Sequence, residues 1–466
     1  MNLKEKLEKY SFLIKFSKLA TKREEKVYIV GGFVRDLFLG RDKKEFDFLI
    51  VGDGVQFAKE ISKKLNEKKV VIYKTFGTAQ FQHEDYFLEF VGAREESYDR
   101  ASRNPKVERG TFLQDIKRRD FTINTLAISL NKNDFGELID TYNGLEDIEK
   151  KILRTPIDPM VTFDDDPLRI MRAFRFASNL EFDVVDEIKI AASEMKERLS
   201  IVAQERITEE FLKILSSARP SIGLKLMYET GVMSIVFPEI SIMGGVEQRK
   251  DYHHKDVFQH TCIVVDNISK VTDDVWLRFA ALVHDIAKPQ TKRFVEGIGW
   301  TFHGHEEMGA RMMKSVFEKL KLPLHKIEYI KKLIRLHLRP IALVDDDVTD
   351  SAIRRLIVQA DEELDDLITL CRADITSKNP NKVTKYLENY EKVMSRVREV
   401  REKDKLRAFQ SPVRGDEIMK VLDIKPSKTV GIVKSRIEEA ILEGEIPNEY
   451  EAAFEYLIKI KNEYKN

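Results

Sequence analysis

The pattern of the chain changes near residue 156, and this change limits the possible folds more than any other feature. Before it, short apolar segments with strand-like character are separated by turn residues. After it, apolar residues recur at helical spacing almost to the end of the chain. The sequence therefore predicts a small α+β head followed by an all-α remainder. The strand-like segments are "KVYIVGG", "FDFLIVG", "VVIYKTFG", "TAQFQHE", "YFLEFVGA" and "LAISLN".

Composition narrows the class of protein without deciding its function. With 466 residues the chain is long enough for about three domains, and a charged fraction of 34% favours long helices with solvated faces. Lys plus Arg and Asp plus Glu are equal at 79 each. Net charge therefore neither supports nor excludes a nucleic-acid partner.

Two features bear on the compartment. Cys262 and Cys371 are the two cysteines and form no CxxC motif, which fits a reducing compartment and no structural zinc. The N-terminal "MNLKEKLEKYSFLIKFSKLA" is interrupted by lysines, and no stretch reaches the ~18 apolar residues of a membrane helix. We therefore expect a cytoplasmic protein without a membrane partner.

The stretch "YIVGGFVRDLFLGRDKKEFDFLIV" carries the first candidate site. An apolar strand stops at Gly31 and Gly32, where the backbone can approach a phosphate closely, and Arg35 can add a bidentate contact. On the next strand Glu45 and Asp47 are two residues apart and so share one face. Two neighbouring carboxylates need a cation, and Mg²⁺ binds through carboxylates and substrate phosphates. The pattern favours metal-dependent nucleotidyl transfer, although a plain turn and a solvated strand face would use the same residues.

Further polar motifs follow in order along the chain. They are "KRRDFTINTLAI", "IDTYNGLEDI", "FDDDPLRIMRAFRFA" and "AQERITEEFLKIL". With the first stretch they cover nearly the whole sequence and resemble the bacterial-type (class II) tRNA nucleotidyltransferases and the related bacterial poly(A) polymerases. This resemblance implies a polymerase-β-like head with a mixed sheet, followed by a helical neck, body and tail.

The resemblance also implies a nucleotide site. In that family one motif contacts the triphosphate, a second reads the ribose, and an Asp–Arg pair hydrogen-bonds the base edge. The matching residues are Gly31, Gly32, Arg35 and Asp36 for the triphosphate, Arg119, Asp120 and Asn124 for the ribose, Asp166 and Arg169 for the base, and Arg172 and Arg175 near the phosphates. Asp166 also precedes Pro167 and suits a helix N-cap, and the two roles can coexist.

In the same family the paired strand carboxylates hold the catalytic metals, which places Mg²⁺ on Glu45 and Asp47. The family pattern is Asp-x-Asp, so Glu45 departs from it by one methylene, and the geometry of Mg²⁺ is strict. Glu89 is a candidate third catalytic carboxylate, with an exposed strand glutamate as the alternative. The polar segment from 94 to 117 matches the family's flexible loop, which helps the switch from CTP to ATP.

A second candidate site lies among the histidines of the helical part. Imidazoles and carboxylates together suit first-row divalent metals, and their order here resembles the HD phosphohydrolase signature. The residues are His260, His284, Asp285, His305, His337 and Asp374. The resemblance implies that His260, His284, Asp285 and Asp374 hold a divalent transition metal or Mg²⁺, while His305 and His337 line the site or hold a second ion. The alternative is a domain that only shapes the tRNA-binding body.

These inferences combine into one expected function. We expect a nucleotidyltransferase head (1–155), a neck that binds base and RNA (156–245), an HD domain (246–378) and a helical tail (379–466), whose Lys428 and Lys434 meet tRNA phosphates or only solvent. The expected activity adds CCA to the 3′ end of tRNA from CTP and ATP without a nucleic-acid template, alongside metal-dependent phosphohydrolysis by the HD domain. The alternatives are a poly(A) polymerase, an enzyme adding only CC or only A, or an HD phosphohydrolase with an inactive RNA-binding head.

Overall fold

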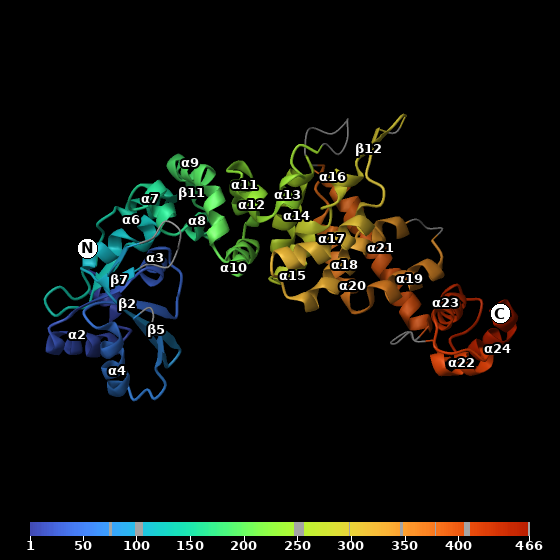
Figure 1. Cartoon of the computed structure of the whole chain (residues 1–466), viewed down its shortest axis with the longest axis horizontal. Coiled ribbons are helices and arrows are strands. Elements are labelled where there is room, and N and C mark those ends of the chain that lie inside the picture. The colour runs from blue at the N-terminus through green and yellow to red at the C-terminus, as the bar shows by residue number, and fades with distance from the viewer. Residues whose placement is uncertain are drawn as a thin grey trace. The chain divides into compact units, whose positions relative to one another are not determined.

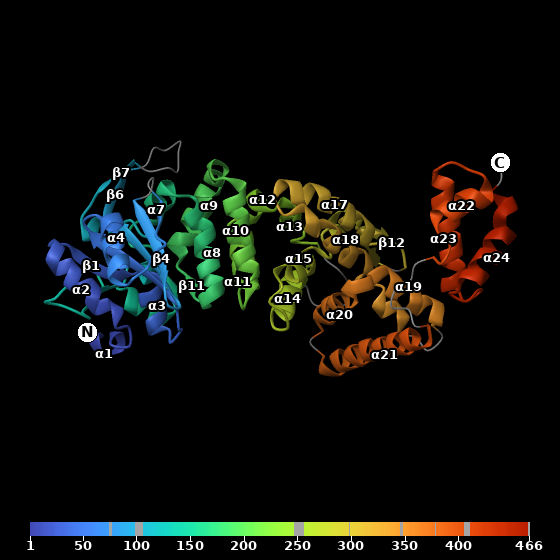
Figure 2. The ribbon, with the colours of Figure 1, turned by 90° about the horizontal axis from the view of Figure 1, so that it is seen from below.

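The computed structural model describes residues 1–73, 77–97, 106–246, 256–297, 299–344, 348–377, 379–404 and 411–464. The chain divides into two compact units, Met1–Ser241 and Ile242–Asn466. Figures 1 and 2 show both, with the strands of the large sheet confined to the first unit. The finer division into four domains remains a prediction.

The first unit contains a seven-stranded mixed sheet in the order β3-β4-β5-β2-β1-β8-β9. Strands β2 and β5 pair in parallel, and the other neighbours pair antiparallel. The mixed sheet predicted for the head is therefore confirmed. Its strands are β1 (Lys26–Val30), β2 (Glu45–Val51), β3 (Val71–Tyr73), β4 (Thr78–His83), β5 (Tyr86–Gly92), β8 (Ala127–Ser129) and β9 (Leu138–Ile139).

The helices of this unit precede the strands of the sheet, connect them or follow them in the sequence. Those of the head are α1 (Lys4–Leu7), α2 (Phe12–Arg23), α3 (Gly32–Phe38), α4 (Gly54–Lys64), α5 (Phe112–Lys117), the 3-10 helix η2 (Thr122–Asn124) and α6 (Gly144–Lys150). Those that follow are α7 (Pro159–Asp165), α8 (Leu168–Leu180), α9 (Asp186–Met195), the 3-10 helix η3 (Lys196–Ile201), α10 (Gln204–Leu215), α11 (Pro220–Glu229), α12 (Val232–Val236) and α13 (Pro238–Ser241). The two-residue strands β10 (Ile152–Leu153) and β11 (Asp183–Val184) pair in parallel at the junction of head and neck.

Aromatic packing fixes which face of the sheet can carry polar residues. Phe48 of β2 stacks on Phe90 of β5 at 5.0 Å between ring centroids and contacts Phe16 of α2 at 4.7 Å. Phe46 points the same way and stacks on Phe33 of α3 at 4.1 Å. Because side chains alternate along a strand, the odd-numbered residues of β2 face away from this aromatic core.

The neck is held together by close helix packing around α8. Its buried side chains recur at helical spacing and face α10 and α11. Gly223 of α11 donates its backbone N–H to Ser178 Oγ at 2.8 Å. A β-carbon at position 223 would lie 2.5 Å from that oxygen and 3.0 Å from the carbonyl oxygen of Phe174. Glycine is thus required for this approach of the two helices.

Among its described residues, the second unit is helical apart from one hairpin. Its elements up to residue 344 are α14 (Val257–Ser269), α15 (Val275–Val283), α16 (Lys288–Thr291), β12 (Arg293–Val295), β13 (Gly299–Thr301), α17 (His305–Lys319), η4 (Leu324–Lys326), α18 (Ile327–Leu336) and η5 (Pro340–Leu343). They are followed by α19 (Asp350–Ala360), η6 (Asp361–Glu363), α20 (Leu364–Ala373), α21 (Pro380–Asp404), α22 (Gly415–Leu422), α23 (Lys428–Leu442), α24 (Tyr450–Ile460) and η7 (Lys461–Glu463). Helices α22, α23 and α24 enclose a small apolar core of their own, and Figure 2 shows them side by side.

Three local predictions were incomplete. The segment predicted as a loop contains the paired strands β6 (Arg94–Ser97) and β7 (Lys106–Arg109), and residues 98–105 between them lie outside the described residues. The helical part contains the hairpin β12–β13. Helix α8 begins one residue later than predicted, with Pro167 as N-cap, while Asp166 Oδ1 accepts from the N–H of Leu168 at 3.2 Å.

Within the described residues, none of the helices has the length and apolar character needed to cross a membrane.

Candidate functional site

The predicted head carboxylates lie on the face of the sheet opposite the aromatic core. In the parallel pairing of β2 with β5, Asp47 is directly opposite Glu89, so the two carboxylates are neighbours. Burial raises the pKa of Asp47 against the opposing charges of Arg119 and Lys43. Burial, reinforced by the charge of Asp47, raises the pKa of Glu89. Two neighbouring carboxylates with raised pKa values favour the binding of a cation between them.

Glu45 shares the strand with Asp47 but is much more accessible. Its side chain is 65% exposed, and its Oε2 lies 3.3 Å from Nζ of Lys43. The same Nζ lies 3.8 Å from Oδ2 of Asp36. Lys43 was not among the predicted site residues, although it stands two residues before Glu45 on the same side. The longer glutamate can thus reach toward solvent and Lys43, and in the described part of the chain the three head carboxylates form no tight cluster of ligand atoms.

Gly31 directly follows the last residue of β1 and lies next to the carboxylate of Asp47. Its φ of +71° lies in the region that favours glycine. A β-carbon there would lie 3.2 Å from Asp47 Oδ2 and 3.3 Å from Arg119 Nη1. The absence of a side chain at Gly31 therefore keeps Asp47 and Arg119 close to the backbone.

A buried polar network links three of the predicted nucleotide motifs. Arg35 donates to both carboxylate oxygens of Asp36, at 2.9 and 3.0 Å, and from Nη1 to Asn124 Oδ1 at 2.8 Å. The Nδ2 of Asn124 donates to Asp120 Oδ1 at 2.9 Å, and Arg172 donates to Asp120 Oδ2 from Nη2 at 2.5 Å. Burial alone would raise the pKa of Asp120, but the charge of Arg172 and the bond from Asn124 hold that pKa well below its usual range. The network orients α3, η2 and α8 relative to one another.

Three arginines surround one aromatic ring at this point. The guanidinium carbons of Arg175, Arg35 and Arg172 lie 4.5, 5.2 and 5.6 Å from the centroid of the Phe176 ring. Sequence reasoning missed Phe176, although its place directly after Arg175 in "RAFRFA" was visible. Arg175 Nε also lies 2.8 Å from Oε2 of the buried Glu210 on α10. The ring and the ion pairs together hold the three guanidinium groups in place beside the sheet.

Arg169 and Asp166, predicted to read the base edge, occupy different environments. Arg169 is buried and donates to the carbonyl oxygens of Arg118, at 2.7 Å, and Thr162, at 3.2 Å. These bonds use donors on both terminal nitrogens of the guanidinium. Asp166 is partly exposed at the junction of α7 and α8. The backbone contacts of Arg169 fix its plane, which is a prerequisite for reading a base edge.

Asp115 is a further buried carboxylate that sequence reasoning missed. It accepts from Arg118 Nη2 at 2.6 Å and from Arg119 Nη2 at 3.2 Å. Burial alone would raise its pKa, but the charges of Arg119 and Arg118 lower it. Asp115 therefore holds Arg119 in place beside Asp47.

The six residues predicted for the second site converge in the second unit. His260 lies in the first turn of α14, and His305 is the first residue of α17. His284, His337 and Asp374 are the C-cap residues of α15, α18 and α20. The C-terminal ends of three helices and the N-terminal ends of two therefore meet at this point.

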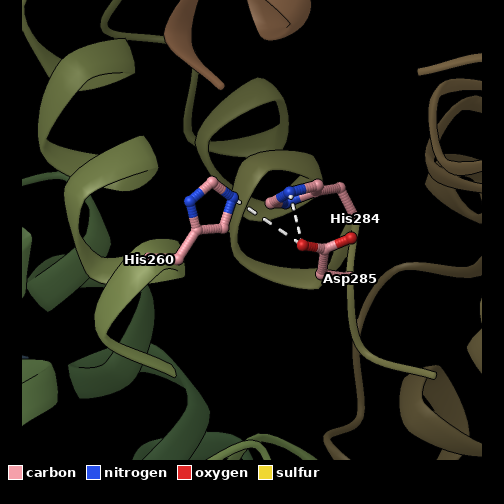
Figure 3. Close-up of side chains that lie close together, drawn as sticks. All are labelled: His260, His284 and Asp285. Atoms are coloured by element: carbon pink, nitrogen blue, oxygen red, sulfur yellow. Dashed lines mark ion pairs between the residues drawn. The ribbon is translucent and has the colours of Figure 1, made fainter. Parts of the chain in front are cut away.

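Asp285 is at the centre of this cluster, which Figure 3 shows in part. Its Oδ2 lies 3.2 Å from His284 Nε2 and 3.7 Å from His260 Nε2, and its Oδ1 lies 3.3 Å from His305 Nε2. Two overlapping groups of three have ligand atoms within 4.8 Å of one another, and both contain Asp285. They are His260, His284 and Asp285, and Asp285, His305 and His337. Asp374 Oδ1 joins them at 2.8 Å from His260 Nε2.

The outer nitrogens of the imidazoles are already committed. A backbone carbonyl only accepts, so each ring that contacts one through Nδ1 carries a proton there, and in the neutral ring that a metal ligand requires the lone pair is then on Nε2. The three rings and their backbone carbonyls are His284 with Ala281 at 2.8 Å, His305 with Phe302 at 2.7 Å and His337 with Ile334 at 2.6 Å. In addition, Cys371 Sγ donates to the backbone carbonyl of His337 at 3.0 Å.

The charge balance of the cluster also fits a cation. Burial alone would raise the pKa of Asp285, but His284 and Lys288 hold it well below its usual range. Burial alone would lower the pKa of His284, but the charges of Asp285 and Asp374 raise it to about 10. His284 Nε2, Asp285 Oδ1 and Asp374 Oδ1 are buried and make no well-aligned hydrogen bond. This donor set of nitrogen and oxygen atoms matches a first-row divalent metal.

Comparison with known proteins gives these sites a family. The family model described as "Poly A polymerase head domain" matches residues 27–154, "Probable RNA and SrmB- binding site of polymerase A" matches 181–243, and "HD domain" matches 257–378. The chain is 31% identical over 369 residues to the multifunctional CCA protein of Xanthomonas campestris pv. campestris (strain B100), covering 75% of this chain and 84% of that protein. The chain belongs to the CCA-adding tRNA nucleotidyltransferase family.

Two other similarities concern part of the sequence and the fold. The A-adding tRNA nucleotidyltransferase of Aquifex aeolicus (strain VF5) is 44% identical over 157 residues, which cover 34% of this chain and 19% of that protein. A solved CCA-adding enzyme in an apo form has a TM-score of 0.65 at 23% identity, with 98% of this chain and 97% of that chain covered. The predicted family and the predicted fold, a polymerase-β-like head followed by an all-α body with an HD domain, are both confirmed.

Proposed function

We propose that this chain adds CCA to the 3′ end of tRNA, using CTP and ATP without a nucleic-acid template. The observation that carries the proposal is membership of the CCA-adding family, supported by a head in which Asp47 and Glu89 are neighbours beside a network of arginines. The product sequence then depends on the protein alone, because no template strand pairs with the incoming base.

The strand carboxylates fit the metal expected in this family. Asp47, Glu45 and Glu89 would hold Mg²⁺, since carboxylate oxygens are its preferred protein ligands. Bound Mg²⁺ supplies stabilisation of the charge that develops when the 3′-hydroxyl displaces pyrophosphate. Gly31 leaves backbone room next to Asp47 for the triphosphate, and Arg119 stands at the same place with its guanidinium held by Asp115.

Nucleotide selection would rest on groups that are fixed before the substrate arrives. Asp120 and Asn124 are held between Arg35 and Arg172, so the ribose meets a prepared set of donors and acceptors. Arg169, fixed by two backbone carbonyls, and Asp166 stand at the start of α8, where a base edge can be read by hydrogen bonds. Pre-oriented side chains lower the entropy lost when the nucleotide binds.

We also propose a phosphohydrolase activity in the HD domain. His260, His284, Asp285 and Asp374 would hold a divalent transition metal or Mg²⁺, and His305 and His337 lie on the other side of Asp285. A metal there supplies an activated water for hydrolysis of phosphomonoesters or cyclic phosphates. The supporting observation is that Nε2 of His284, His305 and His337 faces Asp285 while Nδ1 of each ring donates to a backbone carbonyl, which leaves Nε2 as the metal-binding atom of the neutral ring.

A second candidate function is addition of the terminal A alone. A stretch of 157 residues is 44% identical to the A-adding enzyme of Aquifex aeolicus, whereas the longer match of 369 residues to the multifunctional CCA protein has 31% identity. The two activities differ in one testable respect. An enzyme restricted to A acts only on tRNA that already ends in CC.

The deciding experiment uses two transcripts of one tRNA, one lacking CCA and one ending in CC. Each is incubated with the purified chain and Mg²⁺, with CTP alone, ATP alone or both. Extension of the first transcript by CTP supports CCA addition. Extension of only the second transcript, and only by ATP, supports A addition and contradicts the main proposal. A long ATP ladder on either transcript would indicate a poly(A) polymerase.

A further inference from the structure

The hairpin β12–β13 carries exposed aromatic side chains directly beside the HD cluster. Phe294 is 55% exposed and Trp300 is 37% exposed, which is unusual for large aromatic residues on two short strands. The register places Phe294 opposite Trp300, so both rings lie on one face, with centroids 5.2 Å apart. In Figure 1 the hairpin extends outward from α16 and α17. A face of this kind is available to a partner.

Positive charge accompanies these rings. Lys292 Nζ lies 4.3 Å from the centroid of the Trp300 ring, on the face that carries Phe294. Arg293 is also exposed, but it alternates with Phe294 along β12 and so lies on the opposite face of the hairpin. Aromatic rings combined with a cationic side chain match single-stranded nucleic acid, whose bases stack while a phosphate contacts the cation. A purely apolar protein partner would leave Lys292 desolvated and without a countercharge.

Both ends of the hairpin are anchored in the HD cluster. Before β12, Lys288 Nζ lies 2.6 Å from Asp285 Oδ2. After β13, the carbonyl of Phe302 accepts from His305 Nδ1, and the Phe302 ring lies 5.6 Å from Lys288 Nζ. The short segments at both ends of the hairpin therefore connect its aromatic face to the proposed metal ligands. A strand of RNA stacked on the hairpin would have its terminal phosphate close to these ligands.

We propose that the hairpin β12–β13 binds the unpaired 3′ end of an RNA and presents its terminal phosphate or cyclic phosphate to the HD cluster. Phe294 is the stacking ring because it is the more exposed of the two. Trp300 supports it, and Lys292 contacts a backbone phosphate. The role in presenting the phosphate rests on the proposed phosphohydrolase activity, whereas the binding of single-stranded RNA does not.

The fluorescence of Trp300 can report RNA binding directly, because Trp276 is the one other tryptophan in the chain and can be replaced. In the full chain carrying Trp276→Phe, the fluorescence of Trp300 is titrated with a single-stranded hexaribonucleotide bearing a 3′-phosphate and with a blunt RNA duplex of the same sequence. We expect quenching by the single strand and not by the duplex. Adding Phe294→Ser should weaken the single-strand affinity about 5- to 150-fold, since one stacked base is worth about 1–3 kcal/mol.

Catalysis gives an independent readout. Phe294→Ser should lower the ratio of kcat/KM for the 3′-phosphorylated hexamer to kcat/KM for p-nitrophenyl phosphate by about tenfold. The matched control is Tyr73→Ser, which removes an aromatic ring of 45% exposure from the edge of the head sheet and should leave the ratio unchanged.

Three outcomes separate the possibilities. If the single strand quenches Trp300 fluorescence and Phe294→Ser weakens that quenching, the proposal is supported. If, in addition, the wild type hydrolyses neither phosphate substrate, the phosphohydrolase function is wrong but the RNA-binding surface is still supported. Equal quenching in both proteins, or none in either, overturns the proposal. A change of oligomeric state in Phe294→Ser with unaltered RNA titration assigns the hairpin to a protein contact and also overturns it.

Discussion

The Nη2 atom of Arg172 lies 2.5 Å from Oδ2 of Asp120, and Nε of the same guanidinium lies 2.9 Å from that oxygen. Asp120 is buried in the head, and Arg172 belongs to α8 of the neck. The pair therefore joins the motif expected to read the ribose to the helix expected to read the base. A geometric change in either partner should affect both stability and nucleotide binding.

Asp120→Asn tests this pair. The amide keeps the size of the side chain but removes the charge that accepts two hydrogen bonds from the partly exposed Arg172, which should lower the free energy of unfolding by about 2 kcal/mol. The KM values for CTP and ATP should rise about tenfold. Urea unfolding and steady-state kinetics measure the two effects. Asp186→Asn, which removes an exposed ion pair with Lys189, should change stability by less than about 0.5 kcal/mol. Equal effects of both substitutions would contradict the role of the pair.

The same carboxylate predicts a pH dependence. Burial opposes ionisation of Asp120, yet Arg172 and Asn124 hold its pKa below the ordinary value of 3.8. A lowered folded-state pKa contributes stability that is complete above the unfolded-state pKa and is lost as pH falls through the folded-state pKa. The stability difference between wild type and Asp120→Asn should thus be full above about pH 5 and shrink below about pH 4. Unfolding curves at pH 7 and pH 3.5 measure it, and a constant difference would argue against an ionised Asp120.

Separate substitutions should distinguish the two proposed sites. Asp47→Asn should reduce nucleotide addition by about 10³-fold or more, because a metal-binding carboxylate is lost, and leave phosphatase activity intact. Asp285→Asn should do the reverse. Gel extension and phosphate release measure the activities on the same preparations. Asp85→Asn, an exposed carboxylate paired with Lys44, is the control and should change neither. Loss of both activities in Asp47→Asn would mean that the sites are not independent.

The proposed role of Glu45 in metal binding can be tested by changing the charge and the length of its side chain separately. Glu45→Gln removes the charge and should slow nucleotide addition about 10- to 100-fold, whereas Glu45→Asp keeps it and restores the family pattern. We expect at least wild-type activity from Glu45→Asp, because the carboxylate then stands nearer the backbone of β2. Single-turnover extension assays in Mg²⁺ and Mn²⁺ compare the variants. A fully active Glu45→Gln would remove Glu45 from the metal site.

Metal removal should destabilise the HD domain. An ion bound to the folded state alone contributes RT ln(1 + [M]/Kd), or about 2.7 kcal/mol at a metal concentration 100 times Kd. Elemental analysis and melting curves of chelated and of Mn²⁺- or Mg²⁺-supplemented protein test this expectation. The shift should vanish in Asp285→Asn, whose side chain is shared by both groups of ligands. An equal shift in that variant would mean that the ion binds elsewhere.

Local patterns in the sequence predicted the sheet well and the contacts between distant residues poorly. Alternation placed Glu45 and Asp47 on one strand face, because Phe46 and Phe48 had to enter the core. The hairpin β12–β13 was not predicted, since strands of three residues are too short to show alternation.

The residues of the candidate sites also divide into those that local sequence patterns predicted and those whose roles depend on contacts between distant residues. His260 and Asp374 are 114 positions apart, and only the resemblance to a family suggested that they meet. Phe176 and Lys288 were missed because their roles depend on which side chains surround them in space. Such contacts are set by tertiary packing, which a single sequence does not display.

The most direct test of the central claim is the intact mass of a tRNA transcript that lacks its CCA end, measured after incubation with the purified chain, Mg²⁺, CTP and ATP. The account predicts one product heavier by two cytidylates and one adenylate, and no product with Asp47→Asn. An unchanged mass with the wild-type chain, or a series of products differing by single adenylates, would contradict it.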